Sequence, residues 1–217
     1  LTRDGHFKPA FDSLWVVYHF VGEFGKAVEL FNKYPQYLQY YPTAGLQQAI
    51  SLAEVGRIDE ATAAAERVLP MAGGNRILLE QVTRSMVRHG GAAKALALVE
   101  KVLAADPKNA DLHVLAARLA CDNGDCKRGL EYADKGLQLE PGYRSLATER
   151  GRILFDSGEE DAGIKALTEQ VSGDLTNADA LIYLSRRLAK LHGDVSQAQD
   201  IGRQAVNAAP MALRASI

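Results

Sequence analysis

The chain has 217 residues, of which 47% are hydrophobic and 24% are charged, a composition typical of a globular protein. Its net charge of −2 gives no basic field that would attract nucleic acid or an anionic membrane. No run approaches the roughly 20 apolar residues needed to cross a bilayer. We therefore expect no nucleic-acid partner and no direct membrane insertion.

Glycine recurs at every thirty-fourth position along the chain. Five glycines keep this interval and a sixth comes one position late, and each is followed five places later by a small residue. The glycines are Gly22, Gly56, Gly90, Gly124, Gly158 and Gly193, and the small residues are Ala27, Ala61, Ala95, Gly129, Gly163 and Ala198. Such a period indicates a repeat protein. We expect one array of six repeats, 8–41, 42–75, 76–109, 110–143, 144–177 and 178–212.

The repeat at 110–143 shows the physical basis of one unit. Leu112, Leu115 and Leu119 have the three-to-four spacing of a buried helical face. Gly124 can adopt the left-handed conformation that ends a helix. A second periodic stretch follows, and Pro141 stops it. Each repeat is therefore predicted to be a pair of antiparallel helices that cross closely at small side chains.

These features resemble the tetratricopeptide repeat (TPR) family over residues 8–212. The resemblance implies an all-α fold, a right-handed α-solenoid of antiparallel helix pairs, whose first helices line a concave groove. The family expects a small residue at the eighth position of each repeat and a buried Leu at the seventh. Trp15 and Arg150 depart from these two rules, and Pro35 falls within the expected second helix of the first repeat. We expect the first repeat to be distorted and the fifth to have a loosened core.

The chain stops at Ile217, within what would be the start of a seventh repeat, and no polar capping helix follows. We therefore expect the sequence to be a fragment of a longer array.

Aromatic side chains are concentrated at the start of the chain, since 11 of the 15 lie within positions 1–41. Aromatic residues at helical spacing usually fill a core, and a distorted first repeat would need such bulk. The segment 33–42 is harder to bury entirely. Tyr37, Tyr40 and Tyr41 are therefore candidates for a docking surface, because tyrosine suits interfaces.

Arginine occupies the ninth position of four consecutive repeats, a position that points into the groove in TPR proteins. These residues are Arg84, Arg118, Arg152 and Arg186. The residues four places after Arg84 and Arg186 are Arg88 and Lys190, which extend the basic set. Because a guanidinium group binds carboxylates through a planar fork of donors, the set predicts a groove for an acidic extended segment.

An internal ion-pair lattice is the competing interpretation of these arginines. Asp122 and Asp156 lie four places after Arg118 and Arg152, within reach on one helix, and Glu149 could reach across from the next repeat. Exposed pairs of this kind contribute under about 1 kcal/mol and would not exclude a ligand.

Cys121 and Cys126 flank the turn of the fourth repeat. They are either a disulfide, which would imply an oxidising compartment such as a periplasm, or two reduced thiols in a cytoplasmic protein. Neither they nor the histidines have metal-ligand spacing, and no catalytic or phosphate-binding motif occurs, so we expect no metal, no cofactor and no enzymatic activity.

The resemblance therefore predicts a scaffold that binds a protein or peptide partner. A narrower hypothesis places it in a bacterial secretion or polysaccharide-export system. The alternative is a regulatory or substrate-recruiting portion of a larger enzyme. The RNA-binding relatives of the family read bases with paired polar residues, and the fifth positions here follow no such code.

Overall fold

The computed structural model describes residues 7–41, 44–69, 76–173, 180, 182–187, 200 and 203. All regular structure in these parts of the chain is helical. Contacts divide the chain into two compact units, Leu1–Ala105 and Asp106–Ile217, here called the N-terminal and C-terminal halves. The continuity of one array across this division stays a prediction.

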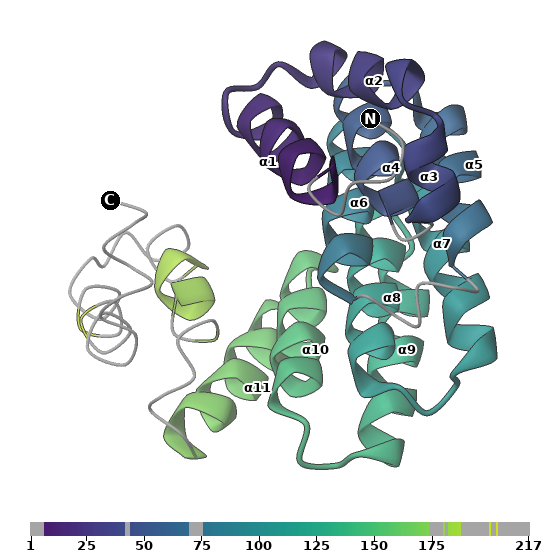
Figure 1. Ribbon diagram of the computed structural model, residues 1–217. Helices are drawn as coiled ribbons and strands as arrows, with labels where there is room; N and C mark the ends of the chain where they lie inside the picture. The colour runs from purple at the N-terminus through teal and green to yellow at the C-terminus, as the bar shows by residue number, and fades with distance from the viewer. Residues whose placement is uncertain are drawn as a thin grey trace. The chain divides into compact units, whose positions relative to one another are not determined.

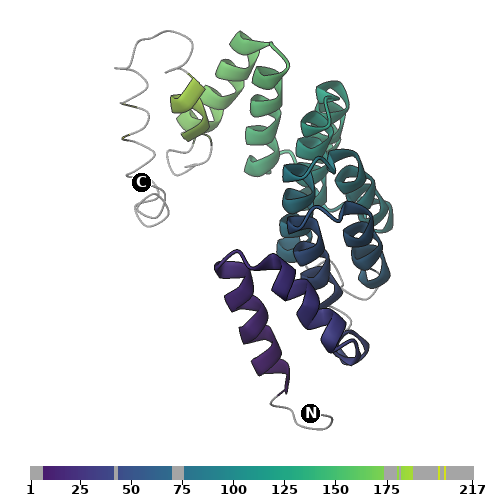
Figure 2. The same cartoon turned by 90° about the horizontal axis from the view of Figure 1, so that it is seen from above.

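Apart from the short α3, the described helices alternate between the first and second members of the predicted pairs (Figures 1 and 2). The N-terminal half contains α1 (Phe7–Phe20), α2 (Phe24–Lys33), α3 (Gln36–Tyr40), α4 (Ala44–Glu54), α5 (Ile58–Val68), α6 (Arg76–Arg88) and α7 (Ala92–Ala105). The C-terminal half contains α8 (Ala110–Asp122), α9 (Cys126–Leu139), α10 (Arg144–Asp156) and α11 (Glu160–Gly173). We call α1, α4, α6, α8 and α10 the leading helices, because each opens a repeat.

Each pair closes through the same turn. At the end of α8, Gly124 has a φ of 88°, and the amides of Gly124 and Asp125 donate to the carbonyls of Cys121 and Ala120. This is the helix-ending motif that requires a left-handed residue. The Asp125 side chain then accepts from the Arg128 amide and caps α9. The other four glycines of the spacing within the described residues also have positive φ, as the sequence predicts.

Close helix crossings within each pair depend on small residues. Ala61 and Ala95 are fully buried shortly after their turn glycines, while Gly129 and Gly163 occupy the same place in α9 and α11. A side chain at Gly129 would meet the Ala117 carbonyl oxygen of α8 at 2.8 Å. Consecutive pairs then pack on one another within each half, α4 against α6 and α8 against α10.

The first repeat is distorted in the predicted place. Its second helix stops at Lys33, and Pro35 lies at the N-cap position immediately before the short α3. Trp15, at the position expected to be small, is buried and donates from Nε1 to Ser51 Oγ of α4 at 2.9 Å. The bulky side chain therefore fills the space between two leading helices.

Candidate functional site: the leading helices and their arginines

The arginines predicted to line a groove all lie on leading helices or, for Arg186, in the described segment 182–187. Lys190 lies outside the described residues. Arg84 and Arg88 belong to the N-terminal half, and Arg118, Arg152 and Arg186 to the C-terminal half.

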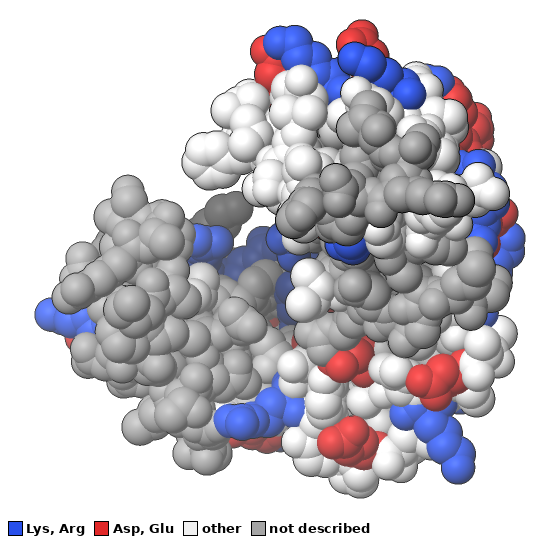
Figure 3. Space-filling view, viewed as in Figure 1, with Lys and Arg blue, Asp and Glu red and all other residues white. Residues whose placement is uncertain are grey.

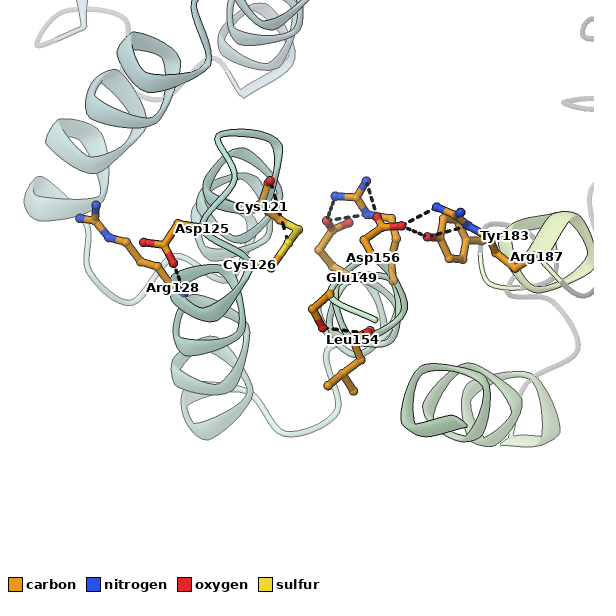
Figure 4. The surroundings of a disulfide bond; sticks show 11 residues. Cys121, Asp125, Cys126, Arg128, Glu149, Leu154, Asp156, Tyr183 and Arg187 are labelled. Atoms are coloured by element: carbon orange, nitrogen blue, oxygen red, sulfur yellow. Dashed lines mark hydrogen bonds and ion pairs between the residues drawn. A yellow bond between two sulfur atoms is a disulfide. The ribbon is translucent and has the colours of Figure 1, made fainter. Parts of the chain in front are cut away.

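In the C-terminal half, Arg118 and Arg152 converge on one buried carboxylate. The Glu149 side chain is only 5% exposed. Arg118 of α8 donates from Nε and Nη2 to Glu149 Oε2 at 3.4 and 3.3 Å, and Arg152 of α10 donates from Nε to Oε1 at 2.9 Å. Figure 4 shows Glu149 of this cluster beside the turn that holds the cysteines. Of the two interpretations of these arginines, this geometry favours internal pairing.

Asp156, at the end of α10, continues the network. It accepts from Tyr183 Oη at 2.8 Å and from the Arg187 guanidinium, and it lies 3.9 Å from Arg152 Nη1 (Figure 4). Burial, together with the hydrogen bond to Asp156, raises the pKa of Tyr183 to about 12. Burial disfavours the charged form of Arg152, but the carboxylates of Glu149, Asp122 and Asp156 together outweigh this effect, so the pKa of Arg152 is raised. Asp156 thus lies between Arg152 of its own repeat and Arg187 of the next, and its ion pair with Arg187 joins the two repeats.

In the N-terminal half, Arg88 has the corresponding role. It donates to Glu54 of α4, whose side chain is buried, and Ser85 Oγ donates to the same carboxylate at 2.6 Å. Arg84 instead pairs along its own helix with Glu80 Oε1 at 2.9 Å. Both guanidinium groups stay largely in solvent, because the side chains of Arg84 and Arg88 are 65% and 58% exposed.

Sequence reasoning missed Glu54, Tyr183 and Arg187. A signal for the acids is present in the repeat, since Glu54, Asp122 and Asp156 share the thirteenth position. That position lies at the carboxyl end of the leading helix, and in α4 and α10 it binds the following repeat.

The three tyrosines proposed as a docking surface differ in how far their side chains are exposed. Tyr37 is buried, its ring stacks on Phe11 with centroids 3.6 Å apart, and its hydroxyl donates to Asp12. Burial and that carboxylate raise the pKa of Tyr37. Tyr41 is half-buried against Tyr37. Tyr40 is exposed and is the member of the three best placed to meet a partner.

Cys121 and Cys126 form a disulfide that joins the end of α8 to the start of α9 (Figure 4). The part of the chain that the structure describes gathers no group of three or more His, Cys, Asp or Glu side chains suited to a metal ion. None of the helices in the described ranges combines the length and hydropathy of a membrane-spanning segment.

Arg150 also departs from its predicted surroundings. It lies at the expected position of a buried Leu, but its Nε donates to Asp134 Oδ1 of α9 at 2.6 Å. A hollow of about 340 Å³ lies beside it between α9, α10 and α11, with Leu137 and Glu169 among its lining residues. The hollow lies at the surface, and the core residues Leu146, Ile153 and Leu167 of the same repeat are fully buried, so the loosened core of the fifth repeat stays a prediction.

The hairpins and their stacking define an all-α solenoid class of protein. No family model matches the chain, and no curated protein matches it. The fold is that of tetratricopeptide repeat proteins of known structure. It is similar to a tetratricopeptide repeat protein from Parabacteroides merdae ATCC 43184, with 14% identity, a TM-score of 0.60, and coverage of 94% of this chain and 80% of that one.

Two further structures have the same fold. TTC0263, a thermophilic TPR protein of Thermus thermophilus, is 19% identical with a TM-score of 0.58, over 78% of this chain and 92% of that one. MamA from Desulfovibrio magneticus RS-1 is 16% identical with a TM-score of 0.50, over 76% of this chain and 93% of that one. At such identities the likeness establishes the fold and leaves the partner to be argued from this chain's own residues.

Proposed function

We propose that the protein is a non-catalytic scaffold that binds an extended acidic protein segment on the exposed face of its leading helices. The observation that carries this proposal is a stripe on α6. Ile77, Gln81, Arg84 and Arg88 follow one another at intervals of four, three and four positions, and all four side chains are exposed. This spacing places them along one face of the helix.

The chemistry of the stripe suits a carboxylate-bearing segment. Arg84 keeps most of its guanidinium group in solvent, and its pair with Glu80 lies on the surface, where an ion pair contributes under about 1 kcal/mol. A carboxylate of a ligand can therefore compete for its donors. Ile77 supplies an apolar contact at the start of the same face, where a partner side chain would lose water.

The acidic-segment role falls mainly on the N-terminal half. Arg118 and Arg152, which the sequence includes in the same groove, are held by the buried Glu149. If either guanidinium group moved to a ligand, the buried Glu149 carboxylate would lose one of its two ion-pair partners. Burying a charge without its partner is unfavourable in free energy. Arg186 belongs to the C-terminal half and is exposed, so it is a candidate for a separate contact of that half.

Binding of a labelled Glu-rich peptide, measured by fluorescence anisotropy against a Lys-rich peptide of equal length, tests this function. We expect the Glu-rich peptide to bind, and Arg84→Gln to weaken binding by about tenfold, since a charge-assisted hydrogen bond is lost. Arg88 is left unchanged in this test because it also pairs with the buried Glu54. Arg67→Gln on the second helix α5 is the matched control, and it should leave affinity unchanged. Equal binding of both peptides, or equal loss in the control, contradicts the proposal.

The disulfide supports an oxidising setting for this scaffold. A Cys121–Cys126 bridge persists outside the reducing cytosol, so it favours the periplasmic alternative and is consistent with the bacterial secretion or polysaccharide-export setting. Alkylation of unreduced protein isolated from its native compartment distinguishes the two settings, because only reduced cysteines gain mass.

A further inference from the structure

The stripe on α6 places an apolar side chain in line with a cation. Ile77 is 70% exposed, and it is the one large apolar side chain that is exposed within the described parts of α4, α6, α8 and α10. Arg84 lies seven positions later on the same face, with most of its guanidinium group in solvent. Gln81 lies between them and is also exposed. An apolar, an amide and a cationic contact therefore follow one another along this face.

The other leading helices combine these groups differently. In α8 and α10 the corresponding arginines, Arg118 and Arg152, bind the buried Glu149, and the residues seven positions before them are polar. On α1 the segment 13–22 exposes several apolar side chains but contains no Asp, Glu, Lys or Arg, and the surface over α1 in Figure 3 is accordingly white. The face of α6 therefore differs in chemistry from its counterparts on these three helices.

The interval between Ile77 and Arg84 limits how one partner segment can meet both. Seven residues of helix rise about 10 Å. Helical side chains lean toward the amino end, and Arg84 reaches back to Glu80, one turn before it, so its guanidinium group lies somewhat closer to Ile77 than this rise. A segment in the polyproline II conformation places side chains three positions apart on one face, about 9 Å from each other. A β-strand places them about 7 or 13 Å apart, which fits less well.

We propose that the partner segment carries an apolar residue three positions from an acidic one, and that Ile77 binds the first while Arg84 binds the second. This inference rests on the proposed function, because it concerns the same face, and it adds selectivity for the apolar residue. Gln81 can bind the main chain between the two, since its amide both donates and accepts hydrogen bonds. Ile77 is then the specificity-determining residue, because an apolar side chain buried against it gains free energy that a purely acidic segment lacks.

Three labelled peptides with the same central block of glutamates test this selectivity in fluorescence anisotropy with the full chain. The first carries a leucine three positions from the nearest glutamate on each side, so the direction of binding does not matter. The second has alanine in place of each leucine. In the third the leucines lie six positions away, about 19 Å in the polyproline II conformation, and too far to reach Ile77. We expect the first peptide to bind about fivefold more tightly than the other two, because one apolar side chain becomes buried.

Variants of the protein assign this preference to one side chain. Ile77→Ala should bind the three peptides equally well. Leu139→Ala, which truncates another exposed apolar residue at the end of the second helix α9, is the control and should keep the fivefold preference. Circular dichroism verifies that both variants are folded.

The possible results separate this inference from the proposed function. If the wild type binds the first peptide no more tightly than either of the others, or if Ile77→Ala keeps the preference, the inference is overturned. The proposed function then still stands, provided that the glutamate peptides bind more tightly than the Lys-rich peptide. If none of them does, the proposed function and this inference both fail.

Discussion

At the scale of single residues, Glu149 determines what two of the predicted groove arginines do. A carboxylate this buried is tolerated because Arg118 and Arg152 approach its two oxygens from different helices. Arg118 belongs to one repeat and Glu149 and Arg152 to the next, so the cluster also connects α8 to α10.

Glu149→Ala should lower the free energy of unfolding by about 2–3 kcal/mol, because two half-buried guanidinium groups lose their shared partner. Urea denaturation followed by circular dichroism measures the change. Glu66→Ala is the matched control, since it removes one partner of an exposed ion pair with Lys101 and should cost less than about 1 kcal/mol. Similar losses in the two variants would show that Glu149 contributes no more than a surface pair.

The sequence predicts that arginines recur at the ninth position and names Asp122, Asp156 and Glu149 as possible partners, but it does not decide between these pairs and a ligand. The recurrence follows from the period alone. The pairing of Arg118 with Glu149 of the next repeat depends on how far one leading helix rotates against the next, and no local pattern encodes that rotation. Tyr37 illustrates the same limit, because its helical spacing suits both a core and a surface, and only packing against Phe11 decides between them.

At the scale of helices, the sequence predicts that a small residue follows each turn glycine. It does not predict at which of these positions only glycine fits. The sequence places alanine or glycine there without distinction. In α11 a Cβ at Gly163 would lie 2.8 Å from the Phe155 amide nitrogen and 3.0 Å from the Gly151 carbonyl oxygen. Backbone atoms cannot move aside as a flexible side chain can, so this crossing of α10 and α11 requires glycine.

Gly163→Ala should therefore destabilise the protein by about 1–3 kcal/mol, despite the better helix propensity of alanine. Gly25→Ala in α2 is the comparison, because a Cβ added there would meet nothing within 4 Å. At that position the propensity gain acts alone and should stabilise by up to about 1 kcal/mol. Thermal unfolding measures both, and the same sign of effect in the two variants would contradict the close crossing.

At the scale of the whole molecule, the regular glycine period predicts the order of the helices and the five described turn glycines. It does not mark Ala105 as the end of a compact unit, because the period reflects the local geometry of one helix pair. The division reflects packing among pairs, to which many side chains contribute. Each half has its own buried residues. The fluorescence of Trp15 can follow unfolding of the N-terminal half, and the disulfide allows the stability of the C-terminal half to be changed by reduction.

Reduction of the disulfide should consequently destabilise one half and spare the other. Opening a bridge across so short a loop costs about 2 kcal/mol by loop entropy, and that loss belongs to the C-terminal half. With a reductant, part of the helical circular dichroism signal should melt at a lower temperature, while the fluorescence transition of Trp15 keeps its midpoint. The variant with Cys121→Ser and Cys126→Ser should melt at the temperature of the reduced protein, and adding reductant should not change that temperature. An equal shift of the Trp15 transition would mean that the two halves unfold as one, since only coupled halves transmit a local loss of stability along a repeat array.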